Sequence, residues 1–509
     1  GFFLITFRFT SKFKNKTVLK IIVIGSGFGG LACAVRLKIQ GHDVTLIEKR
    51  DKPGGRGYVY EINGFKFDGG PTVVTAPWLF EELFTSAGRN PKDYYNLTPL
   101  DPFYRIYFSD GTYFNYNGDK ENILSEIRKF DANDVEGYLK FIDTTEDIFK
   151  AGFGLIDKPF HKLSSMMKIL PDLIRLKSHQ SVYKYVSGYI KNEKLRQVFS
   201  FHSLLIGGNP FQSTNIYTLI HFLEKKWGVW YADGGTGSII SGLMKLFNEL
   251  GGKTLLNTEV SEILIDDSGS NRVSGVKLKD GSIIKSDAVV CNAELATAYK
   301  TLIPEKYRKK NTDKKIDSMK YSMSLFVIYF GTDRKYDNIP HHSIILGDRY
   351  KELLDDIFNK YKLSDDFSLY LHRPTATDST LAPPGCDAFY VLSPVPHLNS
   401  GTDWKKESKR YRDLIMSFLE KNYLPELSKH IVAEHYIDPV HFRDELNSHL
   451  GSAFSVEPIL TQSAYLRPHN KSEDIEGLYF TGAGTHPGAG LPGVVNSAKI
   501  VADLIGKQS

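Results

Sequence analysis

The feature that most constrains the fold is a glycine turn near the start of the chain, in KIIVIGSGFGGLACAVRLKIQGHDVTLIEKR (20–50). Ile21 to Ile24 form a continuous apolar run rich in β-branched residues, which is typical of a parallel strand covered on both faces. Leu31 to Ile39 suit a helix that Gly41 ends, and Val44 to Ile47 suit a second strand. The sequence therefore predicts a strand–turn–helix–strand unit that opens an α/β domain.

The glycines of this turn follow the spacing of a dinucleotide site. Gly25 permits the tight turn, Gly27 lets a pyrophosphate approach the backbone, and Gly30 lets the helix pack on the strand. Glu48 follows the second strand, where its carboxylate can accept hydrogen bonds from ribose hydroxyls and disfavours the 2′-phosphate of NADP. The candidate cofactor contacts in this unit are Gly25, Ser26, Gly27, Phe28, Gly29, Gly30, Glu48 and Lys49.

Further glycine turns favour FAD over NAD. Gly54-Gly55-Arg56 supplies a flexible turn with a cation, and Gly69-Gly70-Pro71 follows it. Near the C-terminus, GLYFTGAGTHPGAGLPGVVNSAKI (477–500) places more bare backbone between a strand-like and a helix-like run. An extended FAD needs contacts along its pyrophosphate, ribityl chain and ring, so we predict FAD as the cofactor. The remaining candidate contacts are Gly55, Arg56, Val260, Gly484, Thr485, Gly493 and Val494.

The composition narrows the partners. The 64 Lys and Arg against 59 Asp and Glu leave a net charge of +5, too small a bias to indicate nucleic acid. The 3 scattered cysteines argue against a disulfide framework and a zinc site, and we predict no metal, with His341-His342 at the surface or structural. A second nicotinamide motif is also missing, so we expect oxygen or a quinone as electron acceptor. The 28 Tyr and 32 Phe indicate either a large core or an apolar cavity.

Residues 158–196 have the pattern of a membrane-surface segment. They carry nine Lys and Arg but only two acids, Asp172 and Glu193, among regularly spaced Leu, Ile and Met residues. Such a segment can bury apolar side chains in a bilayer while its cations meet anionic lipid, although a solvated helical lobe fits equally well. No apolar run is long enough to cross a membrane. Residues 1–19 are basic and lack acids, and their role in targeting stays open.

We expect the domains to be interleaved along the sequence, because strand patterns typical of the first domain occur again late in the chain. YSMSLFVIYFG (321–331) and DAFYVLSPVPHL (387–398) predict a second sheet. We expect an α/β fold in which a Rossmann-like FAD-binding domain is interleaved with a mixed-sheet substrate domain and a helical membrane-contacting lobe. The expected segments are FAD-binding at 20–90, 226–300 and 456–509, substrate domain at 91–130 and 301–455, and the helical lobe at 131–225.

Several stretches carry a family resemblance that runs from about Lys20 to the C-terminus. They include PGGRGYVYEINGFKFDGGPTV, EKKWGVWYADGGTGS (224–238), SLYLHRPTATDSTLAPPGCDAFYVLSPVPHL (368–398), GSAFSVEPILTQSAYLRPHN (451–470) and GAGTHPGAGLPGVVNSAK. In this order they resemble bacterial-type phytoene desaturases. The resemblance implies an FAD-dependent enzyme of carotenoid biosynthesis that inserts double bonds into phytoene. It also implies peripheral attachment at the cytoplasmic side of a membrane and products of the neurosporene–lycopene type.

The implied substrate sets the chemistry to look for. A C40 polyene has no polar handle, so its binding requires a long apolar tunnel. Desaturation moves a hydride from an allylic carbon to the flavin, while a base removes the proton from the neighbouring carbon. Glu457 and His486 are the candidate catalytic residues. A carotenoid cis–trans isomerase, a polyene saturase and a non-enzymatic lipid-binding protein of the same fold stay open as alternatives.

Overall fold

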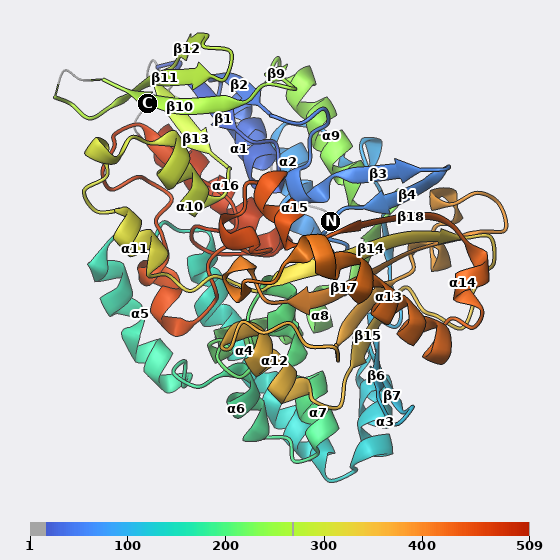
Figure 1. The fold of residues 1–509 in the computed structure, drawn as a ribbon. Helices are drawn as coiled ribbons and strands as arrows, with labels where there is room; N and C mark the ends of the chain where they lie inside the picture. The colour runs from blue at the N-terminus through green and yellow to red at the C-terminus, as the bar shows by residue number, and fades with distance from the viewer. Residues whose placement is uncertain (1–16, 267–268, 508–509) are drawn as a thin grey trace, which may run out of the picture.

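The computed structural model describes residues 17–266 and 269–507, so most of the basic N-terminal segment lies outside the described residues. A five-stranded parallel sheet, here called the parallel sheet, has the order β19-β13-β1-β2-β9. Its strands are β1 (Lys20–Ile24), β2 (Asp43–Ile47), β9 (Lys253–Leu255), β13 (Ala288–Cys291) and β19 (Leu478–Phe480). Segments far apart in the sequence therefore share one sheet (Figure 1).

The alternation of side chains along β1 shows what covers each face of the parallel sheet. Ile21 and Val23 join the core with the helices, whereas Ile22 and Ile24 join a second core with three antiparallel strands. The helices on the first face are α1 (Phe28–Ile39), α2 (Pro77–Ser86), α9 (Thr236–Glu249) and α16 (Leu491–Gly506). The strands on the second face are β10 (Val260–Ile265), β11 (Val273–Leu278) and β12 (Ile283–Lys285). The expected strand–turn–helix–strand unit is confirmed, with the helix beginning at Phe28 rather than at Leu31.

A second, seven-stranded sheet, here called the mixed sheet, has the order β18-β14-β17-β16-β15-β6-β7. Its strands are β6 (Tyr104–Phe108), β7 (Tyr113–Tyr116), β14 (Ser324–Thr332), β15 (His342–Leu346), β16 (Leu369–His372), β17 (Asp387–Val395) and β18 (Ile431–Ile437). Only β15 and β6 pair in parallel, and the other neighbours are antiparallel. On one face Phe326, Ile328 and Phe330 pack into a core with α13 (Trp404–Asn422). The expected mixed second sheet is confirmed.

The middle of the chain is helical, as its sequence pattern predicts. It contains α3 (Lys120–Phe130), α4 (Asp134–Ile156), α5 (Leu163–Arg175), α6 (Val182–Ser187), α7 (Glu193–Val198) and α8 (Leu219–Trp227). Helix α4 packs along α8, and α5 lies at the outer edge of the molecule (Figure 1). None of the described helices combines the length and the apolarity needed to cross a bilayer.

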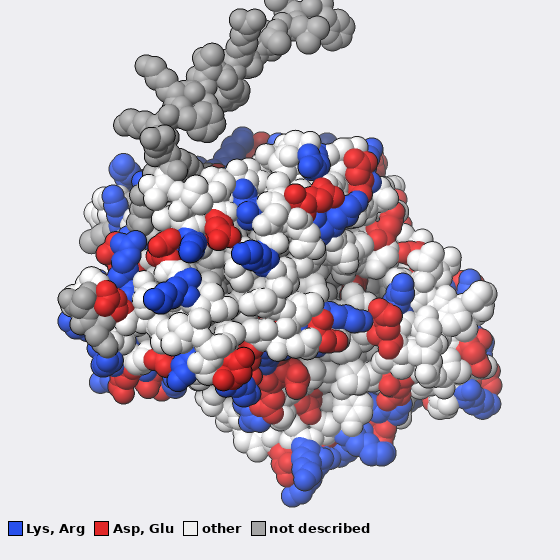
Figure 2. Space-filling view, turned by 90° about the horizontal axis from the view of Figure 1, so that it is seen from above, with Lys and Arg blue, Asp and Glu red and all other residues white. Residues whose placement is uncertain are grey.

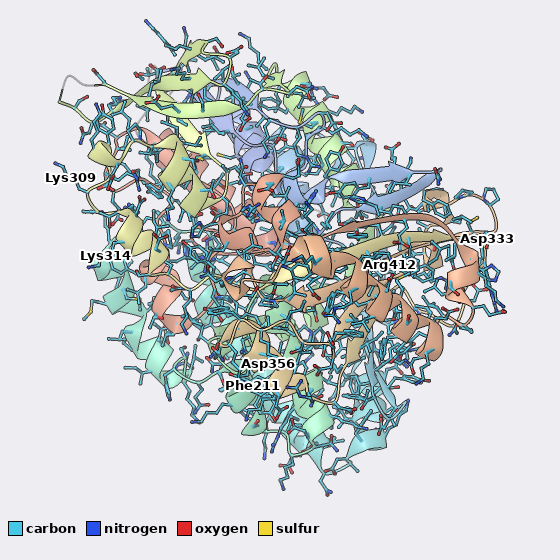
Figure 3. The ribbon with its side chains drawn as sticks, viewed as in Figure 1. Phe211, Lys309, Lys314, Asp333, Asp356 and Arg412 are labelled. Atoms are coloured by element: carbon cyan, nitrogen blue, oxygen red, sulfur yellow. The ribbon has the colours of Figure 1, made fainter. Side chains whose placement is uncertain are left out.

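Short elements complete the chain. They are the strands β3 (Val59–Ile62), β4 (Phe65–Asp68), β5 (Leu97–Pro99) and β8 (Trp230–Ala232), and the helices α10 (Leu295–Thr297), α11 (Asp313–Asp317), α12 (Tyr350–Phe358), α14 (Leu427–His430) and α15 (Pro439–Asp444). Charged side chains such as Lys309, Lys314 and Asp333 lie at the periphery (Figure 3). Positive and negative side chains are interspersed on the face shown in Figure 2, so no large field of one sign covers that face.

Candidate active site

One cavity of about 490 Å³ connects the end of the parallel sheet with one face of the mixed sheet. Most of the cofactor contacts proposed from the sequence line it, although they come from distant parts of the chain. These are Gly25, Gly27, Phe28, Gly29, Glu48, Lys49, Gly55, Arg56, Val260, Gly484, Thr485, Gly493 and Val494. Ser26 and Gly30 lie in the same turn without lining the cavity.

The first glycine turn is packed too closely for side chains. Gly25 has a φ of +89°, and a Cβ on Gly30 would lie 2.0 Å from the carbonyl oxygen of Gly25. Helix α1 begins directly after Gly27 and has no side-chain cap, so its first backbone N–H groups remain available to an anion. A pyrophosphate placed at this helix end would meet bare backbone and the positive end of the helix dipole.

Charged side chains complete this end of the cavity. Glu48 Oε2 accepts hydrogen bonds from the backbone N of Ser26 at 2.9 Å and from Ser26 Oγ at 2.6 Å. Arg56 donates from Nη2 to Ser448 Oγ at 2.8 Å, and its buried Nε has no partner. Burial lowers the pKa of Arg56, which stays a cation at neutral pH. The cleft therefore offers an unused cationic donor to an anionic ligand.

The C-terminal glycine turn is held by two buried polar side chains. Arg467 donates to the carbonyl oxygens of Ala483 at 2.7 Å and Thr485 at 3.1 Å, and only 1% of its surface is exposed. Asn470 donates to Thr485 Oγ1 at 3.2 Å and to the carbonyl oxygen of His486 at 2.8 Å. Buried hydrogen bonds of this kind fix the backbone that faces the cavity. Sequence reasoning missed both residues, because nothing local marks an Arg or an Asn as buried.

The other end of the cavity is apolar. Alternate residues of the mixed sheet point into it, because side chains of a strand alternate between its two faces. The sheet contributes Leu325, Val327, Ile344, Leu346, Tyr370, Tyr390 and Leu392. The opposite wall comes from the helical region and contributes Leu204, Leu205, Ile220 and Leu223. Such walls bind an apolar ligand by removing its surface from water.

A buried carboxylate interrupts this apolar wall. Glu224, on α8, lines the cavity with 0% of its surface exposed. Tyr104 OH donates to its Oε1 at 2.8 Å, and His202 Nε2 lies 3.1 Å from its Oε2. Burial raises the pKa of Glu224 to about 7, and it lowers the pKa of His202 to about 3, so the imidazole is neutral. Glu224 can therefore gain or lose a proton near neutral pH.

The two catalytic candidates from the sequence lie outside the cavity wall. Glu457 is 3% exposed, burial raises its pKa to about 7, and its Oε1 has no hydrogen-bond partner. His486 is 6% exposed, and its ring packs on Phe160 with ring centres 5.3 Å apart. Neither residue lines the cavity that Glu224 lines. Both assignments stay predictions.

Comparison with known proteins shows which family the chain belongs to. The family described as flavin containing amine oxidoreductase matches residues 28–506. The lycopene-forming phytoene desaturase of Pseudescherichia vulneris is 49% identical over 96% of this chain and 99% of its own length. The neurosporene-forming phytoene desaturase of Rhodobacter capsulatus is 42% identical over 96% of this chain and 94% of its own.

The chain belongs to the phytoene desaturase family of flavin-containing amine oxidoreductases. An oxidoreductase structure from Methanosarcina mazei, at 17% identity, aligns with a TM-score of 0.63 over 95% of this chain and 100% of that one, and shows the same fold.

The cleft of this phytoene desaturase family member fits FAD, the cofactor expected from the sequence. The uncapped start of α1 and the unpartnered Arg56 Nε suit the pyrophosphate, and Glu48 suits the ribose. Gly484, Thr485 and Gly493 provide close backbone on the far side of the cleft. A Cβ on Gly493 would lie 2.4 Å from the carbonyl oxygen of Gly488, so that bare backbone is also required by packing.

Proposed function

We propose that this chain is an FAD-dependent phytoene desaturase that converts phytoene into more conjugated carotenes of the neurosporene–lycopene type. The observation that carries the proposal is that one continuous cavity joins the glycine-lined cofactor cleft to an apolar end. The names of the relatives support phytoene as substrate. A hydrocarbon of this length offers only apolar surface, which matches the Leu, Ile and Val side chains of the walls.

The chemistry divides between cofactor and protein. When bound, FAD supplies the acceptor for the two electrons and the hydrogen that leave an allylic carbon as hydride. A proton must also leave the adjacent carbon, and the C–H electrons then form the new double bond. We assign this proton to the Glu224 carboxylate, because it is fully buried and lies among the apolar side chains of the cavity, whereas Glu48 belongs to the cofactor turn. Tyr104 and His202 orient the carboxylate, and the apolar walls exclude water.

The activity test is conversion of phytoene supplied in liposomes with FAD. We expect stepwise products whose absorption shifts to longer wavelength and whose mass falls by two hydrogens per step. An isomerase would leave the mass unchanged, and a saturase would raise it. Absence of conversion in a protein that cannot be reconstituted with FAD would support the lipid-binding alternative instead.

Oxygen or a quinone is the proposed electron acceptor, because the sequence carries no second nicotinamide motif. Under anaerobic conditions without quinone, we expect at most one new double bond per bound flavin. Addition of air or of a soluble quinone should restore repeated turnover. Turnover that depends instead on NAD⁺ would contradict the assignment of the acceptor.

Membrane attachment is proposed for the outer face of α5. Met167, Leu170 and Ile174 recur at spacings of three and four residues, so they share one side of the helix. They are exposed by 61%, 39% and 67% of their surface, and exposed Leu466 lies on a turn that contacts α5. Lys162, Lys168 and Lys177 are exposed beside them. Ile156, at the end of α4, lines the cavity, so a lipid-dissolved substrate would enter near this face.

Because we propose that the apolar side chains of α5 contact the membrane, the double variant Met167→Asp, Ile174→Asp should bind liposomes less well than the wild type. We expect its sedimentation with anionic liposomes to fall by at least about tenfold, because two exposed apolar side chains that would enter the bilayer are replaced by charges. Reversal of Lys162, Lys168 and Lys177 should weaken the binding further at low salt. Ile283→Asp is the matched control, because Ile283 is 58% exposed on β12. Binding of all variants equal to that of the wild type would contradict the assignment of this face as the membrane contact.

A further inference from the structure

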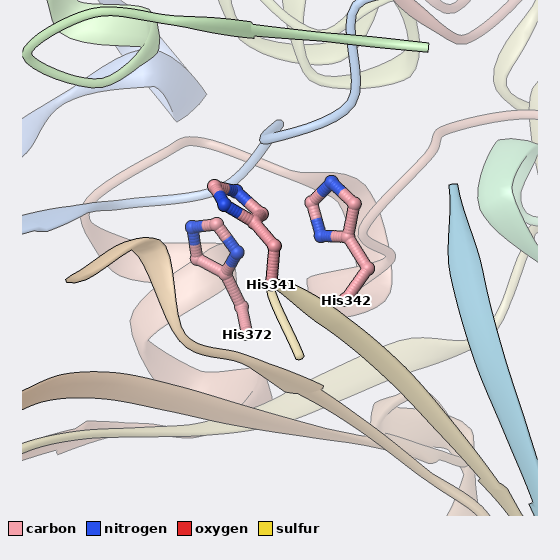
Figure 4. Close-up of side chains that lie close together, drawn as sticks. All are labelled: His341, His342 and His372. Atoms are coloured by element: carbon pink, nitrogen blue, oxygen red, sulfur yellow. The ribbon is translucent and has the colours of Figure 1, made fainter. Parts of the chain in front are cut away.

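Three histidines come together where β15 begins and β16 ends. His342 pairs with His372 across the two strands, and His341 directly precedes β15. Their ring centres lie 4.5 Å (His341–His342), 4.9 Å (His341–His372) and 5.2 Å (His342–His372) apart (Figure 4). They are exposed by only 5%, 1% and 1%. His341 and His342 were expected to lie at the surface or to be structural, and the surface location is wrong: both are buried, with Tyr231 packed on His341 and Tyr104 on His342.

The hydrogen bonds of the cluster leave ring nitrogens without protein partners. His341 Nδ1 lies 2.7 Å from Thr377 Oγ1, and His342 Nδ1 lies 2.7 Å from Tyr370 OH. Tyr370 OH also lies 2.7 Å from Thr72 Oγ1, so it can accept from His342 and donate to Thr72. With Nδ1 as the donor in both histidines, each Nε2 carries a free lone pair.

Four buried nitrogens have no hydrogen-bond partner within normal geometry. They are Nε2 of His341, Nε2 of His342 and both ring nitrogens of His372, whose ring also interacts with the backbone of His341. Leaving buried polar atoms unsatisfied is costly, and native structures rarely do so without a ligand or water. Burial also lowers the pKa of all three rings well below the ordinary range, so they are neutral and can act as ligands.

We propose that His341, His342 and His372 bind a divalent transition-metal ion. One nitrogen from each residue lies within 4.8 Å of the others. Metal–imidazole bonds of about 2.0–2.1 Å in tetrahedral geometry would draw these atoms closer by small ring rotations. Imidazole suits Zn²⁺, Fe²⁺, Cu²⁺ and Ni²⁺, and Thr377 and Tyr370 supply the outer hydrogen bonds that orient such ligands.

The charged groups around the histidine cluster are compatible with the positive charge of a metal ion. Arg373 is the cation that acts on His341, and its guanidinium is paired with Asp387 at 2.9 Å and Asp337 at 2.7 Å. Its positive charge is therefore balanced before a metal ion arrives. Tyr231 packs on His341, and its hydroxyl lies 3.3 Å from Asp378 Oδ2. The Asp378 carboxylate is therefore separated from His341 by the Tyr231 side chain.

We expect the ion to hold β15 and β16 together, two strands of the mixed sheet that lines the cavity. Tyr370 connects the two sites, because its ring lines the cavity and its hydroxyl contacts His342. A metal that fixes His342 would therefore fix Tyr370. This inference departs from the sequence-based expectation of no metal, and it does not rest on the proposed desaturation.

The test measures metal in the purified holoenzyme, after dialysis against metal-free buffer, by mass spectrometry of the elements. We expect about one transition-metal ion per chain, and X-ray absorption that shows the outer-shell scattering of imidazole ligands. His372→Asn and His342→Asn should each lower the metal content by at least about tenfold. His435→Asn is the control, because His435 belongs to the mixed sheet but not to the cluster.

The wild-type protein alone can overturn the proposal, which guards against variants that fail to fold. The proposal is wrong if the protein contains less than about a tenth of an ion per chain and if added Zn²⁺, Fe²⁺, Cu²⁺ or Ni²⁺ leaves its Tm unchanged. Water would then be the partner of the four nitrogens. Because no readout depends on phytoene, the metal site and the desaturase activity can fail independently.

Discussion

Replacing Gly27 by valine is expected to abolish FAD retention. Gly27 lines the cavity directly before α1, and a Cβ there would already lie 3.0 Å from Asn292 Oδ1. The two further methyl groups of valine would occupy the position of the pyrophosphate. We expect the purified variant to lose its visible flavin absorption and to bind added FAD at least about a hundredfold more weakly, which is roughly 3 kcal/mol.

Two measurements separate loss of the cofactor from loss of the fold. Far-UV circular dichroism of the apoprotein should match that of apo wild type, because Gly27 has a φ of −64° that valine can adopt. Gly152→Ala serves as the control, since a Cβ there would meet Leu219 at an ordinary 3.4 Å, away from the glycine turn. A Gly27→Val protein that keeps a normal flavin spectrum would refute the cofactor site.

Replacing Glu224 by glutamine is expected to lower kcat for phytoene by about 10²–10⁴-fold, the usual contribution of a positioned acid or base. Glutamine keeps the size of the side chain and can still accept from Tyr104, but it cannot take up a proton. Retention of FAD and of the thermal unfolding temperature should be nearly unchanged. A substrate-binding role would instead raise KM and leave kcat intact.

Glu457→Gln is the matched control for this experiment, because both carboxyls are buried and burial raises both pKa values to about 7. Of these two carboxyls, only that of Glu224 lines the cavity. The base acts in its ionised form, so wild-type kcat should rise with pH through about 7 and then level off. This rise should persist in Glu457→Gln and vanish in Glu224→Gln. The opposite pattern would assign the proton to Glu457.

Local sequence patterns were sufficient for the parts of the fold that local physics decides. The run from Ile21 to Ile24, the glycines after it and Glu48 indicated a strand, a turn and a cofactor site without any knowledge of distant contacts. The C-terminal turn could be recognised in the same way, because Gly482 to Gly493 require positive φ values or close packing.

The remaining site residues depend on long-range packing that a sequence does not display. Glu224 precedes Lys225 and Lys226 and has the pattern of a solvated helix face, yet Tyr104 and His202 enclose it. His372 follows His342 by 30 positions, and only the register between β15 and β16 makes them neighbours. Burial of a polar group is set by the tertiary fold, which explains why both groups were missed.

In the mixed sheet, one set of residues holds the domain together and a different set lines the cavity. Phe326, Ile328 and Phe330 face the core under α13, whereas Leu325 and Val327 face the cavity. Changes at the second set reshape the space for a polyene while the first set continues to hold the domain together. Neighbouring positions in one strand are therefore subject to different constraints: one position must preserve the core, and the next can change the shape of the cavity. A lineage can change the length or the conjugation of the carotenoid that it accommodates by altering every second residue.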